Sequence, residues 1–65
     1  MTNTYTIQWL DEHKQVYDEL YDCDWKEVSH FKYQAKYYHL CIRVLNTTQC
    51  TTTTYNYLPA ELYCN

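Results

Sequence analysis

The 65-residue sequence lacks glycine altogether and has a single proline, Pro59. A loop that cradles phosphate needs glycine, because a side chain would keep the backbone away from the phosphate oxygens, so we expect no nucleotide-binding loop. No apolar run approaches the ~20 residues of a membrane-spanning helix, and we expect no membrane association. The first residues, MTNTYTIQWL, lack the basic start and apolar stretch of a secretory signal. These absences predict a cytoplasmic protein.

Little space is available for an active site or a metal centre. Sixty-five residues allow one small globular domain, residues 1–65, with a small core and little pocket volume. The four cysteines form no Cys-x-x-Cys pair, and a zinc site would have to combine His39 and Cys41 with distant thiols. We therefore expect no enzyme, no metal and no cofactor. In a reducing cytosol the thiols are expected to be free.

Carboxylates are concentrated in the first half of the chain, although the net charge is only −3. Those before residue 28 are Asp11, Glu12, Asp18, Glu19, Asp22, Asp24 and Glu27. One interpretation is a solvated acidic edge, and another is electrostatic steering toward a basic surface of a partner. The steering residues in the second hypothesis are Asp11, Glu12, Asp18 and Glu19. Nucleic acid is not the expected partner, because neutralising its phosphates requires a surplus of basic residues.

Four segments have the residue pattern of β-strands. Residues 4–10 (TYTIQWL) alternate, residues 40–46 (LCIRVLN) place Leu40, Ile42 and Val44 on one face, and residues 51–58 (TTTTYNYL) are β-branched and aromatic. Residues 15–22 (QVYDELYD) fit a strand or a helix, and we favour the strand. Residues 11–14 and 47–50 are expected to be turns, and residues 60–65 to add one helical turn.

The helix is predicted to begin after Asp24. Asp24 can accept from the first free amides while Glu27 reaches back, which is the pattern of a capping box. Apolar residues then recur at steps of three and four and predict one buried stripe. This stripe consists of Val28, Phe31, Ala35 and Tyr38, with Trp25 at its margin, and the helix is expected to end near Tyr38 or His39.

These elements predict an α+β fold in two layers, with one helix packed on a four-stranded, mainly antiparallel sheet in the order ββαββ. The alternative is β-α-α-β-β, with residues 15–22 helical. Either arrangement covers one face of the sheet and leaves the other open.

The outer side of the helix is the first candidate binding surface. At about 100° per residue, a set of polar and aromatic side chains points away from the predicted core stripe. The set consists of Lys26, His30, Tyr33 and Tyr37. Tyrosine is enriched in the residues that dominate binding energy, so we expect this set to contact a partner.

The open face of the sheet is the second candidate. Depending on strand register, either Tyr17 and Tyr21 or Tyr55 and Tyr57 would lie there. Such rings could simply cover the sheet, could stack on nucleobases, or could be buried in a homodimer.

The overall character is that of a small, acidic, tyrosine- and threonine-rich protein without catalytic residues. It is similar to the accessory proteins with which bacteriophages and mobile elements inhibit host enzymes or defence systems. That resemblance implies a protein-binding module in the host cytosol that inhibits a host nucleic-acid-handling or defence complex by occluding its surface. A nucleic-acid-binding regulator and a homo-oligomeric structural or assembly subunit are the alternatives.

Overall fold

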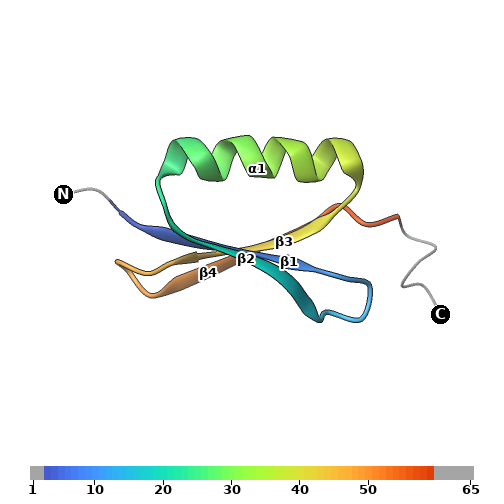
Figure 1. Cartoon of the computed structure of the whole chain (residues 1–65), viewed down its shortest axis with the longest axis horizontal. Helices are drawn as coiled ribbons and strands as arrows, with labels where there is room; N and C mark the ends of the chain where they lie inside the picture. The colour runs from blue at the N-terminus through green and yellow to red at the C-terminus, as the bar shows by residue number, and fades with distance from the viewer. Residues whose placement is uncertain (1–2, 60–65) are drawn as a thin grey trace.

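The computed structural model describes residues 3–59 and has the predicted ββαββ order. The elements are β1 (Tyr5–Leu10), β2 (Val16–Cys23), α1 (Trp25–Tyr38), β3 (Cys41–Asn46) and β4 (Thr51–Asn56). The strands form one antiparallel sheet in the order β2-β1-β3-β4, and α1 lies along one of its faces (Figure 1). Residues 16–23 are therefore a strand, and the alternative with two consecutive helices is wrong.

The helix begins as its sequence predicts. The Asp24 carboxylate accepts from the Glu27 amide at 2.8 Å, and the Glu27 side chain accepts from the Asp24 amide at 3.2 Å. The helix ends at Tyr38, and His39 follows with a left-handed backbone at φ 59°. Glycine usually holds this position, but the chain has none, and the His39 amide still closes the last turn by donating to the Ala35 carbonyl.

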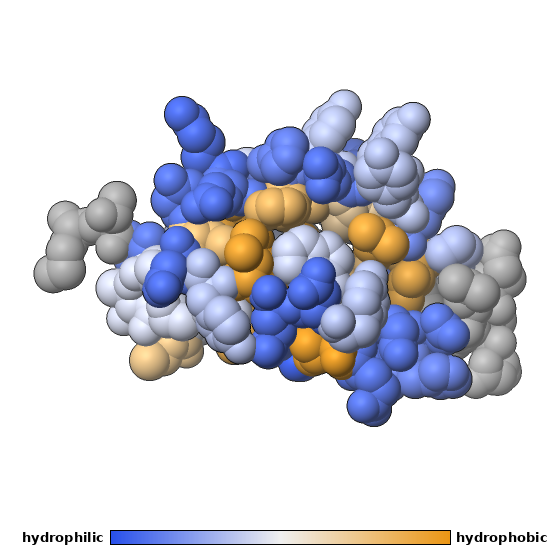
Figure 2. All heavy atoms as spheres, viewed as in Figure 1, coloured by the Kyte–Doolittle hydropathy of each residue, from blue (hydrophilic) through white to orange (hydrophobic). Residues whose placement is uncertain are grey.

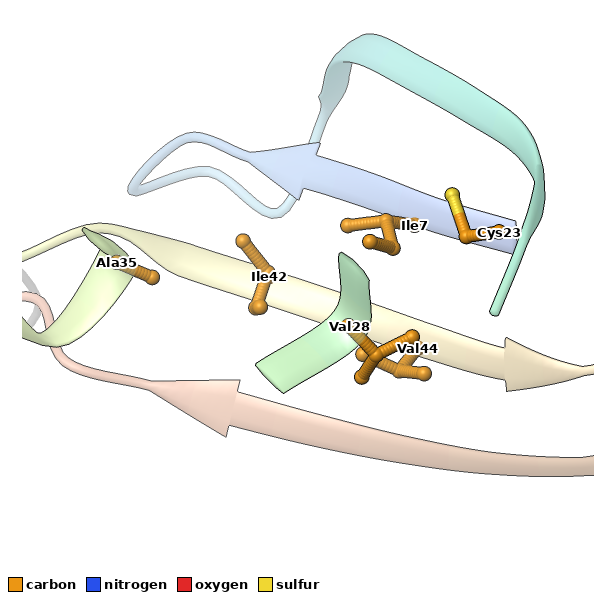
Figure 3. Close-up of a cluster of buried hydrophobic side chains, with 6 residues drawn as sticks. All are labelled: Ile7, Cys23, Val28, Ala35, Ile42 and Val44. Carbon is orange, nitrogen blue, oxygen red and sulfur yellow. The ribbon is translucent and has the colours of Figure 1, made fainter. Parts of the chain in front are cut away.

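The core lies between α1 and the two central strands. Its buried side chains come from all parts of the fold except β4, and Figure 3 shows them gathered between the layers. They are Ile7, Cys23, Val28, Ala35, Ile42 and Val44. Aromatic rings extend this cluster at its margins, where Trp9 packs edge-on against Phe31 with ring centroids 5.4 Å apart. The predicted inward placement of Ile42 and Val44 is confirmed.

One member of the predicted core stripe, Tyr38, is not in the core: its side chain is 63% exposed. On a regular helix Tyr38 points about 70° away from the mean direction of Val28 and Ala35. It also lies in the last turn, and at that end of the molecule the β1–β2 hairpin bends away from the helix (Figure 1). The Tyr38 ring therefore meets the Tyr37 ring, at 4.9 Å between centroids, and not the sheet.

The face of the sheet opposite α1 is covered at one end. Leu10 and Cys41 are directly paired across β1 and β3 on that face, and each is only 4% exposed. They line a cavity of about 450 Å³ together with residues of the β1–β2 loop and Leu58. This second buried site is not apparent in the sequence pattern, because the alternation along each strand assigns these side chains to the open face.

Three cysteines fall within the described residues, and Cys23, Cys41 and Cys50 are all free thiols. Within residues 3–59, the single helix is too short and too polar to cross a bilayer. The helical turn predicted for residues 60–65 lies outside the described residues.

Candidate functional site

The outer side of α1 presents two tyrosines to solvent. Tyr33 is 74% exposed and Tyr37 is 71% exposed, and they stand one helical turn apart on the same side. Figure 2 shows blue and pale side chains projecting from this side of the helix, whereas orange, apolar side chains gather in the seam between helix and sheet. The predicted outward placement of this pair is confirmed.

Three residues of the predicted set lie together, and the fourth does not. His30, Tyr33 and Tyr37 line a shallow depression of about 340 Å³ with Gln34 and Tyr38. The His30 ring nitrogen Nε2 lies 3.2 Å from the Gln34 amide nitrogen, and this contact orients both side chains. Lys26 is also exposed, but it lies in the first turn, about 16 Å along the axis from Tyr37, and does not line the depression.

Tyr38 is a member of this surface that the sequence analysis assigned to the core. Its ring stands edge-on to Tyr37, with the two ring planes at 89°. The angle of about 70° between Tyr38 and the mean direction of Val28 and Ala35 is a signal for this placement. A side chain at the margin of an apolar stripe is buried only where the sheet extends far enough to cover it. We call His30, Tyr33, Gln34, Tyr37 and Tyr38 the tyrosine surface.

A basic flank adjoins the tyrosine surface on the β4 side. A second depression is lined by Tyr33, Lys36 and Tyr37, and a third by residues that include Lys32, Tyr33 and Tyr57. The Lys32 ammonium lies 4.6 Å from the centre of the Tyr55 ring, a cation–π contact that fixes the side chain along the sheet.

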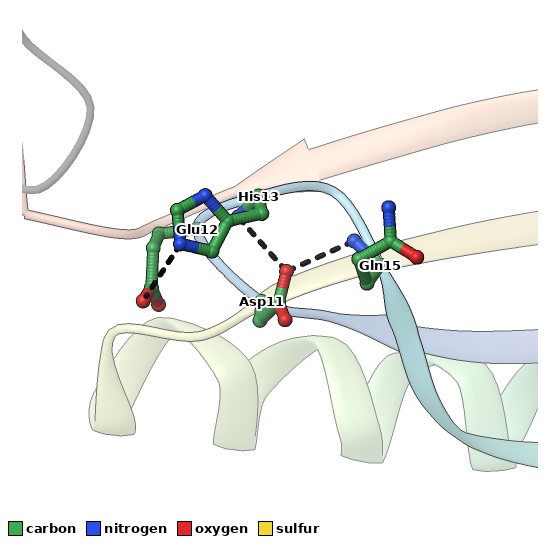
Figure 4. Close-up of polar contacts among 4 residues, drawn as sticks. All are labelled: Asp11, Glu12, His13 and Gln15. Atoms are coloured by element: carbon green, nitrogen blue, oxygen red, sulfur yellow. Dashed lines mark hydrogen bonds and ion pairs between the residues drawn. The ribbon is translucent and has the colours of Figure 1, made fainter.

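The four proposed steering carboxylates lie on the β1–β2 hairpin, apart from the tyrosine surface. In the loop, one Asp11 oxygen accepts from the amides of His13 and Gln15 at 2.8 and 2.9 Å (Figure 4). These bonds, chiefly the one from Gln15, lower the pKa of Asp11. Glu12 lies beside His13, with 3.7 Å between Oε1 and Nε2.

Glu19 on β2 is held by two side chains. Its carboxylate accepts from the Tyr21 hydroxyl at 2.7 Å and from the Gln8 amide at 2.6 Å. The Tyr21 bond and then the Gln8 bond lower the pKa of Glu19, while Glu19 raises the pKa of Tyr21. Its neighbour Asp18 accepts from the Glu19 amide at 2.9 Å. The hairpin therefore carries a fixed negative charge at neutral pH.

Of the two tyrosine pairs considered for the open face of the sheet, Tyr17 and Tyr21 are exposed on β2, at 58% and 61%. Tyr55 and Tyr57 pack against the core on the helix side. Tyr21 lies on the opposite face beside Glu19, and its hydroxyl is bonded to that carboxylate. The Glu19 carboxylate beside Tyr21 repels phosphate, which disfavours stacking of a nucleobase on this ring.

The buried thiols are poor nucleophiles. Burial raises the pKa of Cys23 and of Cys41, in the second case despite the nearby charges of Arg43 and Lys14. The reactive form is the thiolate, which a raised pKa disfavours. Among residues 3–59, no three His, Cys, Asp or Glu side chains come together in a way that could hold a metal ion.

The fold and these surfaces define a two-layer α+β domain with an exposed aromatic helix face. Comparison of the chain with protein-family models, with curated proteins and with solved structures gave no match.

Proposed function

We propose that the protein is a non-catalytic binding module that docks on a partner protein through the tyrosine surface of α1. The observation that carries the proposal is the exposure of Tyr33 and Tyr37, both above 70%, on one side of a capped helix. A tyrosine ring offers a large contact area with few rotatable bonds and a hydroxyl for hydrogen bonding, which is why tyrosine dominates many interfaces.

The helix supplies the rigidity that such a surface needs. Its first turn is fixed by the capping box, and Val28 and Ala35 anchor it to the sheet with no exposed area. A partner therefore meets side chains on a fixed backbone and loses less conformational freedom than it would on a loop.

The partner is proposed to be a host protein complex that handles nucleic acid or serves in defence, which the module inhibits by occupying its surface. The support is the charge of the β1–β2 hairpin, where Asp11, Glu12, Asp18 and Glu19 lie close in the chain. Basic grooves that bind nucleic acid attract such a patch and accelerate association. The tyrosine surface then provides the short-range contacts.

The proposal is tested with the double variant Tyr33→Ala/Tyr37→Ala. Both side chains are exposed, so each substitution should change the free energy of unfolding by less than about 0.5 kcal/mol. Affinity capture from host lysate should then retain a partner on the wild type and lose it on this variant. Tyr17→Ala is the matched control, since this tyrosine is 58% exposed on β2.

Two results would contradict the proposal. A large fall in the melting temperature of Tyr33→Ala/Tyr37→Ala would show that the rings stabilise the fold. Salt-sensitive binding of an oligonucleotide in a gel-shift titration at two salt concentrations would favour a nucleic-acid-binding regulator instead.

A further inference from the structure

The outer edge of β4 carries backbone hydrogen-bonding groups that are not paired within residues 3–59. The β3–β4 register runs one to one from Cys41↔Asn56 to Asn46↔Thr51, and the Tyr57 amide donates to the Leu40 carbonyl at 3.0 Å. In an antiparallel pair the residues alternate between facing the neighbour and facing away. The odd-numbered residues of β4 therefore bond to β3, and the amides and carbonyls of Thr52, Thr54 and Asn56 point outward.

Within residues 3–59, this edge lacks three of the usual protections against pairing, namely charge, proline and a register shift. The sequence of β4, TTTTYN, contains no charged residue and no proline, and its pairing to β3 shows no register shift. Native edge strands are commonly blunted by one of these features. The exposed threonines are β-branched and favour an extended backbone, so the strand is already shaped for a further neighbour.

The opposite edge, β2, is protected in three ways. It carries Asp18, Glu19 and Asp22, and its pairing to β1 has register shifts near both ends. In addition, the outward-facing amide of Glu19 already donates to the Asp18 carboxylate at 2.9 Å. A second strand approaching β2 would meet negative charge and an amide that is already engaged.

We propose that β4 is a self-association interface, at which two copies of this chain pair antiparallel and join their two four-stranded sheets into one. The proposed partner strand is β4 of a second copy, because β4 is uncharged and therefore does not repel itself. The order β2-β1-β3-β4 also keeps the two acidic β2 strands at the far ends of the joined sheet. This inference does not depend on the tyrosine surface.

The register follows from the outward-facing residues. Pairing that uses all three of them places Thr54 of one copy opposite Thr54 of the other, with Thr52 opposite Asn56 on either side. Residues of equal parity then face each other, so the two-fold axis is perpendicular to the sheet and both helices lie on the same face. A shift by one residue would set the outward-facing groups opposite residues whose amides and carbonyls already bond to β3.

Charge at position 54 tests this register directly. Thr54→Lys and Thr54→Asp each place two like charges opposite each other and should weaken the dimer about tenfold or more, whereas mixing the two variants should restore it. Sedimentation equilibrium measures the mass of the particle in solution, which is compared with the 8.0 kDa of one chain. The matched control, Tyr17→Lys, adds the same charge to the opposite edge and should leave the dimer unchanged.

A second measurement uses the wild type alone. The proposal can therefore still be tested if circular dichroism shows that a variant does not fold. Amide hydrogen exchange at Thr52, Thr54 and Asn56 should slow as the protein concentration rises, while exchange along β2 should not. A wild type that stays monomeric to about 1 mM would overturn the proposal. The proposal would also be overturned if the mixture of Thr54→Lys and Thr54→Asp chains did not regain the mass of a dimer. Open-ended polymers that join β4 of one copy to β2 of the next would overturn it as well.

Discussion

The two edge strands of this sheet, β2 and β4, differ in charge, in pairing and in what their outward-facing amides meet. β2 holds three carboxylates and pairs irregularly with β1, whereas β4 is uncharged and pairs one to one with β3. Edge strands expose a template for pairing with other chains, and only β2 shows the features that discourage it. Under our proposals the two edges therefore serve different purposes: repulsion or steering at β2, and association at β4.

The two edge strands also differ in how many of their side chains are buried. Every residue of β2 is exposed from Val16 to Asp22, and only Cys23 at its end enters the core. Along β4 the exposed threonines give way to Tyr55, which packs on the core beneath Lys32, and Tyr57 packs on the core just beyond the strand. β2 is therefore held mainly by its hairpin and by Cys23, while β4 is anchored at the end that leads out of the sheet.

The largest expected effect distinguishes the two sides of β4. Thr53→Pro removes an amide that faces β3 and leaves the Val44 carbonyl without its partner, at a cost of about 1–3 kcal/mol before any clash of the ring. Thr54→Pro removes an outward-facing amide and should change the stability of the single chain much less. Urea unfolding at low protein concentration compares the two variants. Equal losses would show that the register deduced for β4 is wrong.

Much of this fold could be predicted from the sequence because the signals are local. The capping box at Asp24 and Glu27 fixes where the helix begins, and the alternation in residues 40–46 assigns Ile42 and Val44 to the core. The outward placement of Tyr33 and Tyr37 follows from the same helical period.

Other features depend on contacts between elements, which periodicity does not contain. Tyr38 fits the apolar stripe, yet its side chain is 63% exposed because it points to one side of the direction in which Val28 and Ala35 pack. The order of the strands decides that β4 is an edge, and the pairing of Tyr55 with Ile42 places Tyr55 on the helix side. No pattern within residues 51–58 carries that information. The burial of Leu10 and Cys41 on the second face likewise arises from the surrounding loop and Leu58.

The second prediction removes the protection of β2. The triple variant Asp18→Asn/Glu19→Gln/Asp22→Asn keeps the shape of the side chains and eliminates their charge. It should form species larger than a dimer, because both edges can then accept a strand, with a change in stability below about 1 kcal/mol for these exposed positions. Light scattering at neutral pH measures the effect. The matched control replaces Asp11 and Glu12 by their amides in the loop, and an increase in size for that control alone would contradict the assignment.

The smallest expected effect concerns the charge that β2 carries in acid. Tyr21→Phe removes the hydroxyl that is the main cause of the low pKa of Glu19, so this pKa should rise toward the ordinary carboxyl value. A carboxylate with a lowered folded-state pKa contributes stability above its unfolded pKa and loses it as the pH falls through the folded value.

The variant should therefore be slightly less stable than the wild type at neutral pH and equally stable below the folded-state pKa of Glu19. An NMR titration of the Glu19 side chain measures the pKa, with Tyr17→Phe as the control that leaves it unchanged. If Tyr21→Phe leaves the Glu19 pKa in place, the Gln8 bond alone sustains the shift. In that case Gln8 on β1 is what keeps Glu19 ionised. The negative charge that protects the β2 edge would then require β2 to be paired with β1.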